Sequence, residues 1–246
     1  MLSRLFRKRQ PPIEFQPVQP ETVIEIVGDV HGTAHLLRAL PPVEDGATRV
    51  FVGDLVDRGM QSHETLEIVF EGCRNGEWIC LKGNHEEMFL QFLSDPSKGR
   101  NWLRFGGLQT IASFDLGGIT ETSSPEALED IASAIRDRLT PGLLDWLENL
   151  PHVWISNNLA IAHAGLDPKL PISLQKEQVA LWGHPEFAKT PRRDGQWVAH
   201  GHTIVDTPTI RNGVISVDTG AYATNLLTLA RISPDGQIEF SYAPRK

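Results

Sequence analysis

Short apolar runs and helical spacings of apolar residues alternate along the first hundred positions of the chain. The apolar runs predict buried strands at 22–27, 49–52 and 78–81. Apolar residues three or four positions apart predict helices at 33–40, 61–70 and 84–93. Because strands that alternate with helices pair side by side in the same direction, this part of the sequence predicts a largely parallel sheet.

The pattern changes from about residue 94 to residue 151. A loop is expected at the glycine pair 106–107 and a turn at the pair 117–118, and helical patterns follow over 124–139 and 141–149. We expect a helical excursion beside the sheet, which serves as scaffold rather than as a lid. Apolar runs then return at 159–162, 197–199, 214–217, 226–232 and 238–243. Several short strands in succession predict a second, more antiparallel sheet.

Composition and charge narrow the class of protein. The 246 residues are 40% apolar, which is enough for a sizeable core, and no segment approaches the ~20 apolar residues of a membrane span. The net charge of −8 argues against a nucleic-acid-binding protein. The only two cysteines, Cys73 and Cys80, do not form a disulfide framework, and reduced thiols predict a cytoplasmic protein.

The N-terminal segment differs from the rest of the chain. Four basic residues fall within the first ten positions without an apolar stretch after them, and prolines follow at 11, 12, 17 and 20. We expect residues 1–20 to form a flexible, basic, proline-rich tail, with weak contact to anionic lipid as the alternative. Residues 21–246 are expected to form a single domain that includes the helical excursion.

Five short blocks carry most of the polar residues suited to chemistry. They are Gly28–Gly32 (GDVHG), Gly53–Gly59 (GDLVDRG), Gly83–Glu86 (GNHE), His163–Gly165 (HAG) and His200–Thr203 (HGHT). Together they supply two Asp, one Asn and three His suited to divalent metals, an Arg for an anion and a further His for proton transfer. Nearly every block follows an apolar run, which places it at a strand end, where open α/β sheets build their sites.

These blocks, in this order, resemble the calcineurin-like metallophosphoesterases, and the resemblance runs from about Ile24 to about Tyr222. The GDLVDRG form is similar to the phosphoprotein phosphatase branch, especially its small bacterial and phage lambda members. The resemblance implies an α/β fold with two packed β-sheets flanked by helices, an α/β/β/α sandwich. It also implies a hydrolase in which a hydroxide bridging two divalent metal ions (Mn, Fe or Zn) attacks a phosphate ester.

The resemblance also implies a set of metal ligands. Asp29, His31 and His202 would hold the first metal ion, and Asn84 and His163 the second. Asp54 would bridge the two.

The remaining roles concern the substrate and the proton. The family's pattern makes His85 the proton donor, Asp57 the residue that orients it, and Arg58 the group that grips the phosphate. Asn84 and His200 are further candidates for substrate contact, although His200 could instead be structural. Glu86 is interpreted as an acid of the first helical turn, favoured by the helix dipole.

One departure from the family bears on the substrate. Lambda-type phosphatases resemble one another in a Trp-x-Arg segment, where this chain has Trp182-Gly183-His184. Three alternatives stay open: His184 replaces the arginine, Arg192 or Arg193 reaches in, or Arg58 grips the phosphate alone.

The predicted function is a metal-dependent phosphomonoesterase, with a serine/threonine protein phosphatase as the favoured identity. The alternative is a hydrolase of dinucleoside polyphosphates such as diadenosine tetraphosphate, whose members often have Ala at the position of Asp57. A degenerate phosphoesterase that only binds a partner is disfavoured, because no ligand is missing. The expected partner is a phosphoprotein or a small phosphorylated substrate, without nucleic acid or stable membrane insertion, and the oligomeric state is left open.

Overall fold

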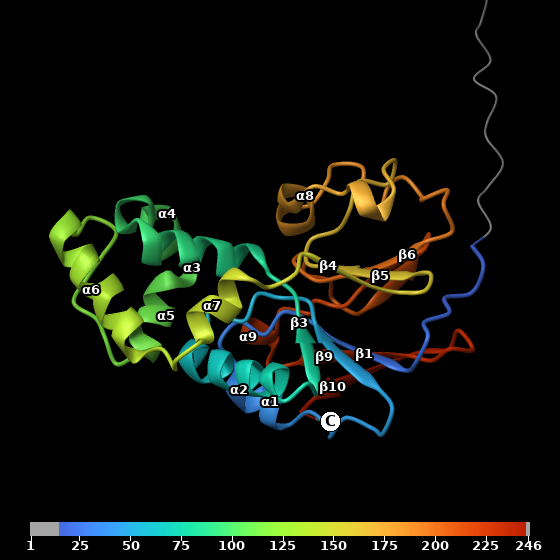
Figure 1. Cartoon of the computed structure of the whole chain (residues 1–246), viewed down its shortest axis with the longest axis horizontal. Coiled ribbons are helices and arrows are strands. Elements are labelled where there is room, and N and C mark those ends of the chain that lie inside the picture. Colours follow the sequence, from blue (N-terminus) through green and yellow to red (C-terminus); the bar gives the residue numbers. More distant parts are fainter. Residues whose placement is uncertain (1–14, 245–246) are drawn as a thin grey trace, which may run out of the picture.

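In the computed structural model, which describes residues 15–244, two five-stranded sheets pack face to face with helices outside them (Figure 1). The first sheet has the order β10 (Ile238–Ala243), β9 (Leu227–Ile232), β1 (Ile24–Val27), β2 (Thr48–Phe51) and β3 (Trp78–Cys80). The second has the order β4 (Val153–Ser156), β5 (Leu159–Ala162), β6 (Trp197–His200), β8 (Val214–Ser216) and β7 (Thr209–Arg211). The predicted α/β/β/α sandwich is confirmed.

The parallel opening of the chain is also confirmed. Strands β1, β2 and β3 pair in parallel, and the connections between them contain α1 (Ala34–Arg38) and α2 (Ser62–Arg74). The apolar face of α2 packs on this sheet through Leu66, Val69 and Phe70. The parallel pairing brings the carboxyl ends of all three strands to one edge of the sheet, as the sequence pattern predicted.

The last two strands correct the prediction of a second, more antiparallel sheet. Strands β9 and β10 were expected in that sheet, but β9 pairs antiparallel with β1 and so joins the first one. The second sheet is mixed, because β5, β6 and β8 run parallel while β4 and β7 pair antiparallel at its edges. An apolar run indicates that a strand is buried on both faces, as β9 is, but it does not identify the neighbouring strand.

Three apolar layers hold the sheets and helices together. Along β1, Ile24 and Ile26 pack between the two sheets, whereas Val27 belongs to the layer between the first sheet and its helices. A smaller layer lies between the second sheet and α8 (Glu177–Trp182). In Figure 1 the elements that enclose these layers are stacked from α1 and α2, through both sheets, to α8. The alternation along β1 is that of a strand covered on both faces.

The helical excursion lies beside the sheets as a separate group of helices (Figure 1). It begins in α3 (Asn84–Ser94) and continues through η1 (Pro96–Lys98), α4 (Arg100–Trp102), η2 (Leu103–Gly107), α5 (Leu108–Ser113), α6 (Pro125–Arg138) and α7 (Leu143–Glu148). The two predicted helices correspond to α6 and α7. At the first glycine pair, where a loop was predicted, the chain is instead helical except for Gly106, which has a φ of 121°.

The remaining described segments are short. Helices η3 (Ile172–Leu174) and α9 (Ala221–Thr224) lie within the long connections of the second half. Of the tail expected to be flexible, residues 15–20 are held against the second sheet, where Phe15 contacts the Trp197 ring and Gln16 accepts a hydrogen bond from its indole N–H. Residues 1–14, with the basic cluster, lie outside the described part. Within that part, none of the helices has the length and apolar character needed to cross a membrane.

A buried ion pair inside the first sheet yields a stability prediction. Glu25 and Arg49 face each other on β1 and β2, are both 2% exposed, and are joined by two hydrogen bonds of 2.6 and 2.9 Å. Arg49→Met leaves the Glu25 carboxylate buried without its partner, so we expect the free energy of unfolding to fall by about 3–5 kcal/mol. Glu25→Leu/Arg49→Met should recover most of that loss in denaturant titrations.

The control for this prediction is the exposed pair of Arg38 and Glu64. Arg38→Met should cost far less stability than Arg49→Met, because water screens an exposed pair. Equal losses for Arg38→Met and Arg49→Met would contradict the argument from burial.

Candidate functional site

The polar blocks lie at the carboxyl ends of five strands from both sheets. Gly28-Asp29 follows β1, Gly53-Asp54 comes after β2, and Gly83-Asn84 comes after β3. From the second sheet, His163 follows β5 and Gly201-His202 follows β6. The site is therefore built where the ends of the two sheets meet. Five of the six predicted ligands are buried, and His202 is partly buried: Asp29, His31, Asp54, Asn84, His163 and His202.

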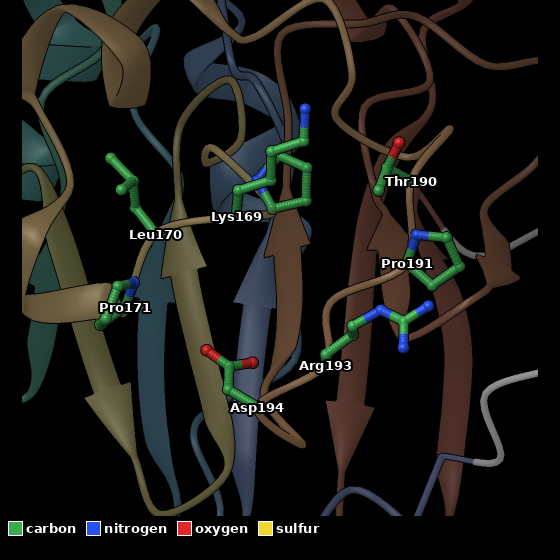
Figure 2. Close-up of a pocket in the computed structure, with 8 residues that line it drawn as sticks. Lys169, Leu170, Pro171, Thr190, Pro191, Arg193 and Asp194 are labelled. Carbon is green, nitrogen blue, oxygen red and sulfur yellow. The ribbon is translucent and has the colours of Figure 1, made fainter. Parts of the chain in front are cut away.

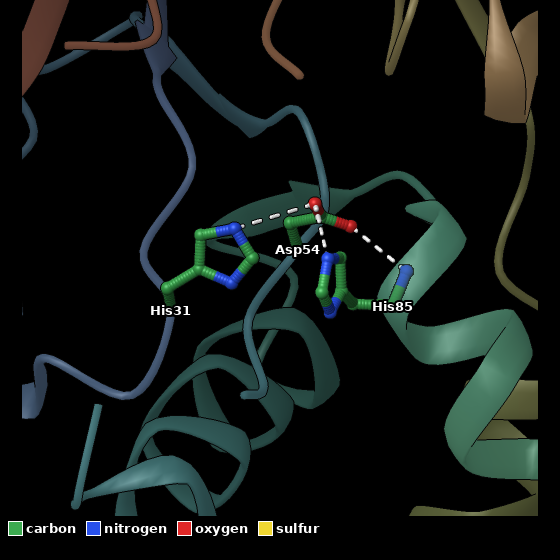
Figure 3. A group of neighbouring side chains, drawn as sticks. All are labelled: His31, Asp54 and His85. Carbon is green, nitrogen blue, oxygen red and sulfur yellow. Dashed lines mark hydrogen bonds and ion pairs between the residues drawn. The ribbon is translucent and has the colours of Figure 1, made fainter. Parts of the chain in front are cut away.

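One cluster forms around one oxygen of the Asp54 carboxylate (Figure 3). The His31 Nε2 atom lies 3.5 Å from Asp54 Oδ2, and His85 Nε2 lies 3.9 Å from the same oxygen. The ligand atoms of these three residues lie within 4.8 Å of one another, so they could hold a metal ion. His85, which the family's pattern makes a proton donor, thus also points its Nε2 toward this cluster.

A second cluster forms around the other oxygen of Asp54. His163 Nε2 lies 3.4 Å from Asp54 Oδ1, and it lies 2.8 Å from Asn84 Oδ1. His202 Nδ1 approaches the same amide oxygen at 2.9 Å. Asp54, His163 and His202 together form a second group that could hold a metal ion. His202 therefore lies with Asn84 and His163, whereas the resemblance grouped it with Asp29 and His31.

Asp29 belongs to neither cluster. Its carboxylate accepts hydrogen bonds from the backbone N–H of His202 at 3.0 and 3.1 Å. Burial, together with the nearby carboxylates of Asp218 and Asp54, raises the pKa of Asp29 well above its usual range. Three acidic groups crowded into a buried space favour a nearby cation.

The tautomers of two histidines fit a metal centre. The Nδ1–H groups of His31 and His163 donate to the backbone carbonyls of Val56 and Val52 at 2.7 and 3.0 Å. Each ring therefore turns an unprotonated Nε2 inward, and the Nε2 of His31 is buried without a hydrogen-bond partner among the described residues. Burial lowers the pKa of His31 to about 3 and that of His163 to about 4, so both rings are neutral, as metal ligands must be.

The backbone around the clusters is constrained. His31, Asp54 and His202 have φ values of 45°, 53° and 62°. These lie in the left-handed region of backbone conformation, which residues other than glycine rarely adopt. The loops also approach so closely that a Cβ on Gly83 would lie 2.2 Å from Asp54 Oδ1. Such strain persists only where surrounding contacts determine the conformation, and it is concentrated here at the candidate site.

Glu86 joins two of the loops, a role that its position in the sequence did not indicate. One oxygen of its buried carboxylate accepts the backbone N–H groups of Asp54 and Gly83 at 2.8 and 2.9 Å. The other accepts those of Leu55 and Val56 at 2.7 and 3.3 Å. An acid in a first helical turn usually faces water, and nothing in the sequence separates that case from this one.

His85 is held by a carboxylate that the helical excursion holds in turn. Its Nδ1–H donates to Asp57 Oδ2 at 2.6 Å, and Asp57 is fully buried. Burial disfavours the charged imidazole, but the carboxylates of Asp54 and Asp57 outweigh it and raise the pKa of His85. Asp57 also accepts the indole N–H of Trp102 at 2.9 Å and the hydroxyl of Thr110 at 2.6 Å. No sequence motif indicated these contacts of Trp102 and Thr110.

Arg58 lies at the mouth of the site, partly exposed. Its Nη2 is 3.2 Å from His85 Nε2, and its guanidinium lies 5.0 Å from the centre of the Tyr222 ring. Tyr222 also packs edge-on against His31 at 5.5 Å between ring centres. Arg58, His85 and the first cluster are thus contiguous, and Tyr222 is a further residue of this mouth that the motifs did not indicate.

The other substrate candidates are placed differently. His200 is buried, with its two ring nitrogens 2.8 Å from the Ser216 hydroxyl and from the Gly201 carbonyl, which favours the structural alternative. Arg192 is buried against Asp194 and two backbone carbonyls. Arg193 lines a surface cavity that none of the five motif blocks enters (Figure 2). Of the three positions considered for the missing arginine, only His184 lies beside the site, in a cavity that also contains His202.

Comparisons with known proteins agree with this geometry. The profile of the family described as "Calcineurin-like phosphoesterase" matches residues 23–206. A protein of Bacillus velezensis named bis(5'-nucleosyl)-tetraphosphatase PrpE [asymmetrical] is 29% identical over 233 residues, which cover 83% of this chain and 86% of the relative.

Two solved structures share the fold. One, provisionally named a diadenosine tetraphosphatase, has a TM-score of 0.60 at 23% identity and covers 91% of this chain and 96% of its own. The other is a serine/threonine phosphatase of Saccharomyces cerevisiae with similarity to human phosphatase PP5. It has a TM-score of 0.59 at 17% identity and covers 92% of this chain and 81% of its own.

The two clusters that share Asp54 predict graded metal binding. We expect about two Mn²⁺ per chain after equilibrium dialysis, because each cluster offers a separate set of ligands. His163→Ala should lose about one ion, since it belongs to one cluster only. Asp54→Ala should lose both, because its two oxygens serve both clusters. His152→Ala is the control, because His152 pairs with Glu177 away from the clusters. Full metal content in a folded Asp54→Ala variant would refute the shared centre.

Proposed function

The chain belongs to the calcineurin-like phosphoesterase family, and from this premise we propose that its site hydrolyses dinucleoside polyphosphates of the diadenosine tetraphosphate class. The observation that carries this proposal is the match to the tetraphosphatase of Bacillus velezensis, which extends over most of both chains. The protein phosphatase, favoured from the sequence, becomes the second candidate. The reaction type, hydrolysis of a phosphate ester or anhydride, is common to both.

The proposed metal ligands are the six residues named by the family's pattern. Asp54, His31, Asn84, His163 and His202 converge on two neighbouring points, and Asp29 adds a third buried carboxylate beside them. When bound there, two divalent ions would supply positive charge to the phosphoryl oxygens and lower the pKa of water. The crowded carboxylates and the inward, unprotonated histidine nitrogens support this assignment.

Arg58 at the mouth of the site and the buried His85 beside it would act on the substrate directly. Arg58 is placed to bind the oxygens of the reacting phosphate through its guanidinium. His85 is placed to give the proton on its Nε2 to the oxygen that leaves, while Asp57 holds its Nδ1–H and keeps the ring oriented. In the overall reaction the bond from phosphorus to the leaving oxygen breaks, and an oxygen from water takes its place.

The serine/threonine protein phosphatase is kept as the second candidate because of Asp57. Hydrolysis of a phosphoserine releases an alkoxide, which needs a proton more than a departing phosphate does. A His85 whose pKa is raised by two carboxylates suits that demand. A function limited to binding is disfavoured, since the proposed ligands, Arg58 and His85 all come together in one site.

A substrate panel tests the proposed function. With Mn²⁺ added, we expect kcat/KM for diadenosine tetraphosphate to exceed that for phosphoserine and phosphothreonine peptides by at least about tenfold, or about 1.4 kcal/mol in transition-state binding. Exhaustive chelation should abolish both activities and hydrolysis of an aryl phosphate, and Mn²⁺ should restore them. The reverse order of substrates would favour the protein phosphatase, and full activity with no metal present would refute both.

The proposed role of His85 predicts a dependence on the leaving group. His85→Asn should retain both metal ions but slow the hydrolysis of an alkyl phosphate by roughly 10²–10⁴-fold, the usual contribution of a general acid. The loss should be much smaller for nitrophenyl phosphate, because nitrophenolate leaves without a proton. If His85→Asn lost a metal ion, His85 would be a ligand of the first cluster. An equal loss on both esters would also rule out the proton-donor role.

A further inference from the structure

A groove beside the second cluster has no role in the chemistry described so far. It has a volume of about 560 Å³ and lies between the segment Trp182–Lys189 and the strands β7 and β8. His202 lines one part of it, so the groove is continuous with the candidate metal centre. A molecule whose reacting phosphate lies at the centre could therefore extend into this groove.

The charge of the groove is opposite to that of the chain. Lys189 and Arg211 line it, and none of its described lining residues carries a carboxylate. The Arg211 guanidinium forms no ion pair with any residue between 15 and 244. In a chain with a net charge of −8, two such cations beside a phosphate-handling centre favour an anionic ligand.

The groove also offers an aromatic surface. Trp182 is the last residue of α8, and this large apolar residue is 43% exposed. Phe187, also in the groove, is committed to packing, because its ring contacts His200 edge-on and closes against Gly165. An exposed indole ring at the edge of a cationic groove is suited to stacking on a nucleobase.

We propose that this groove, which lies between the segment Trp182–Lys189 and the strands β7 and β8, binds the nucleotide part of the substrate that extends beyond the reacting phosphate. The base stacks on Trp182, and the phosphates that do not react lie near Lys189 and Arg211. The proposal rests on the proposed function, since a dinucleoside polyphosphate has such a part and an aryl phosphate does not. The histidine that stands in place of the Trp-x-Arg arginine, His184, also lies in this groove.

Two other cavities fit this role less well. The cavity at the helical excursion borders Arg58 and Tyr222 and exposes Phe105, but it contains Glu121, which already pairs with Arg104 at 2.6 Å. The cavity of Figure 2 combines Lys169 and Arg193 with Asp194 and touches no motif residue. These two cavities supply matched controls.

The test measures competitive inhibition of aryl phosphate hydrolysis, with Mn²⁺ kept in excess over the inhibitor. Two inhibitors are compared, ATP and inorganic triphosphate, which differ only by the nucleoside. Trp182→Ala should raise the Ki of ATP by at least about fivefold, the lower end of a base–aromatic stacking contribution, and leave the Ki of triphosphate unchanged. Trp182→Phe should restore most of the ATP affinity. Arg211→Ala should raise the Ki of both inhibitors.

The controls are Phe105→Ala in the cavity of the helical excursion and Arg193→Ala in the cavity of Figure 2. Neither should change either Ki, and kcat and KM for the aryl phosphate should stay unchanged in every variant. If Phe105→Ala weakens ATP and Trp182→Ala does not, the nucleotide lies against the helical excursion and the proposal is wrong. It is also wrong if Trp182→Ala slows aryl phosphate hydrolysis as much as it weakens ATP.

The same variants separate this inference from the proposed function. If the wild-type protein hydrolyses aryl phosphate but not diadenosine tetraphosphate, the proposed function fails. The predicted pattern of Ki values would then still establish the groove as a nucleotide site. If diadenosine tetraphosphate is hydrolysed but the Ki values do not respond to Trp182 or Arg211, the proposed function stands and the groove is excluded.

Discussion

The position of the Asp54 carboxylate is the constraint on which the site depends. One of its oxygens faces His31 and His85, and the other faces His163, so a small movement of this group would disturb both clusters. The neighbouring structure fixes it from several sides. Glu86 accepts its backbone N–H, and the loop at Gly83 leaves no room for a side chain next to it. The strained φ of Asp54 is maintained by these contacts.

The helical excursion supports the candidate site through Asp57. Trp102 is buried, and both it and Thr110 donate to the carboxylate that orients His85. Hydrogen bonds to a charged group are worth ~1.5–3 kcal/mol, enough to fix the geometry of a buried side chain. A segment that must open and close would have to break them in each turnover. The contacts therefore favour the scaffold interpretation of residues 94–151 over that of a lid.

The sequence predicted those features that depend on local pattern. The parallel strands β1 to β3 and the position of Asp29, Asp54 and Asn84 after them followed from apolar runs and their order. The sheet that β9 joins could not be predicted, because strand pairing depends on distant residues. The roles of Glu86 and Trp102 could not be predicted, because they depend on contacts that form only in the folded chain. The choice between substrates rested on Asp57, which favours a leaving group that needs a proton but does not exclude a dinucleoside polyphosphate.

The ligands of the second cluster come from both sheets, since Asp54 and Asn84 follow strands of the first and His163 and His202 follow strands of the second. An ion held there would cross-link the two sheets and add to the apolar contact between them. The supply of metal ions would then affect the stability of the folded protein as well as its activity. A cell short of the metal would hold a protein that is both inactive and easier to unfold, and therefore one that proteases remove first.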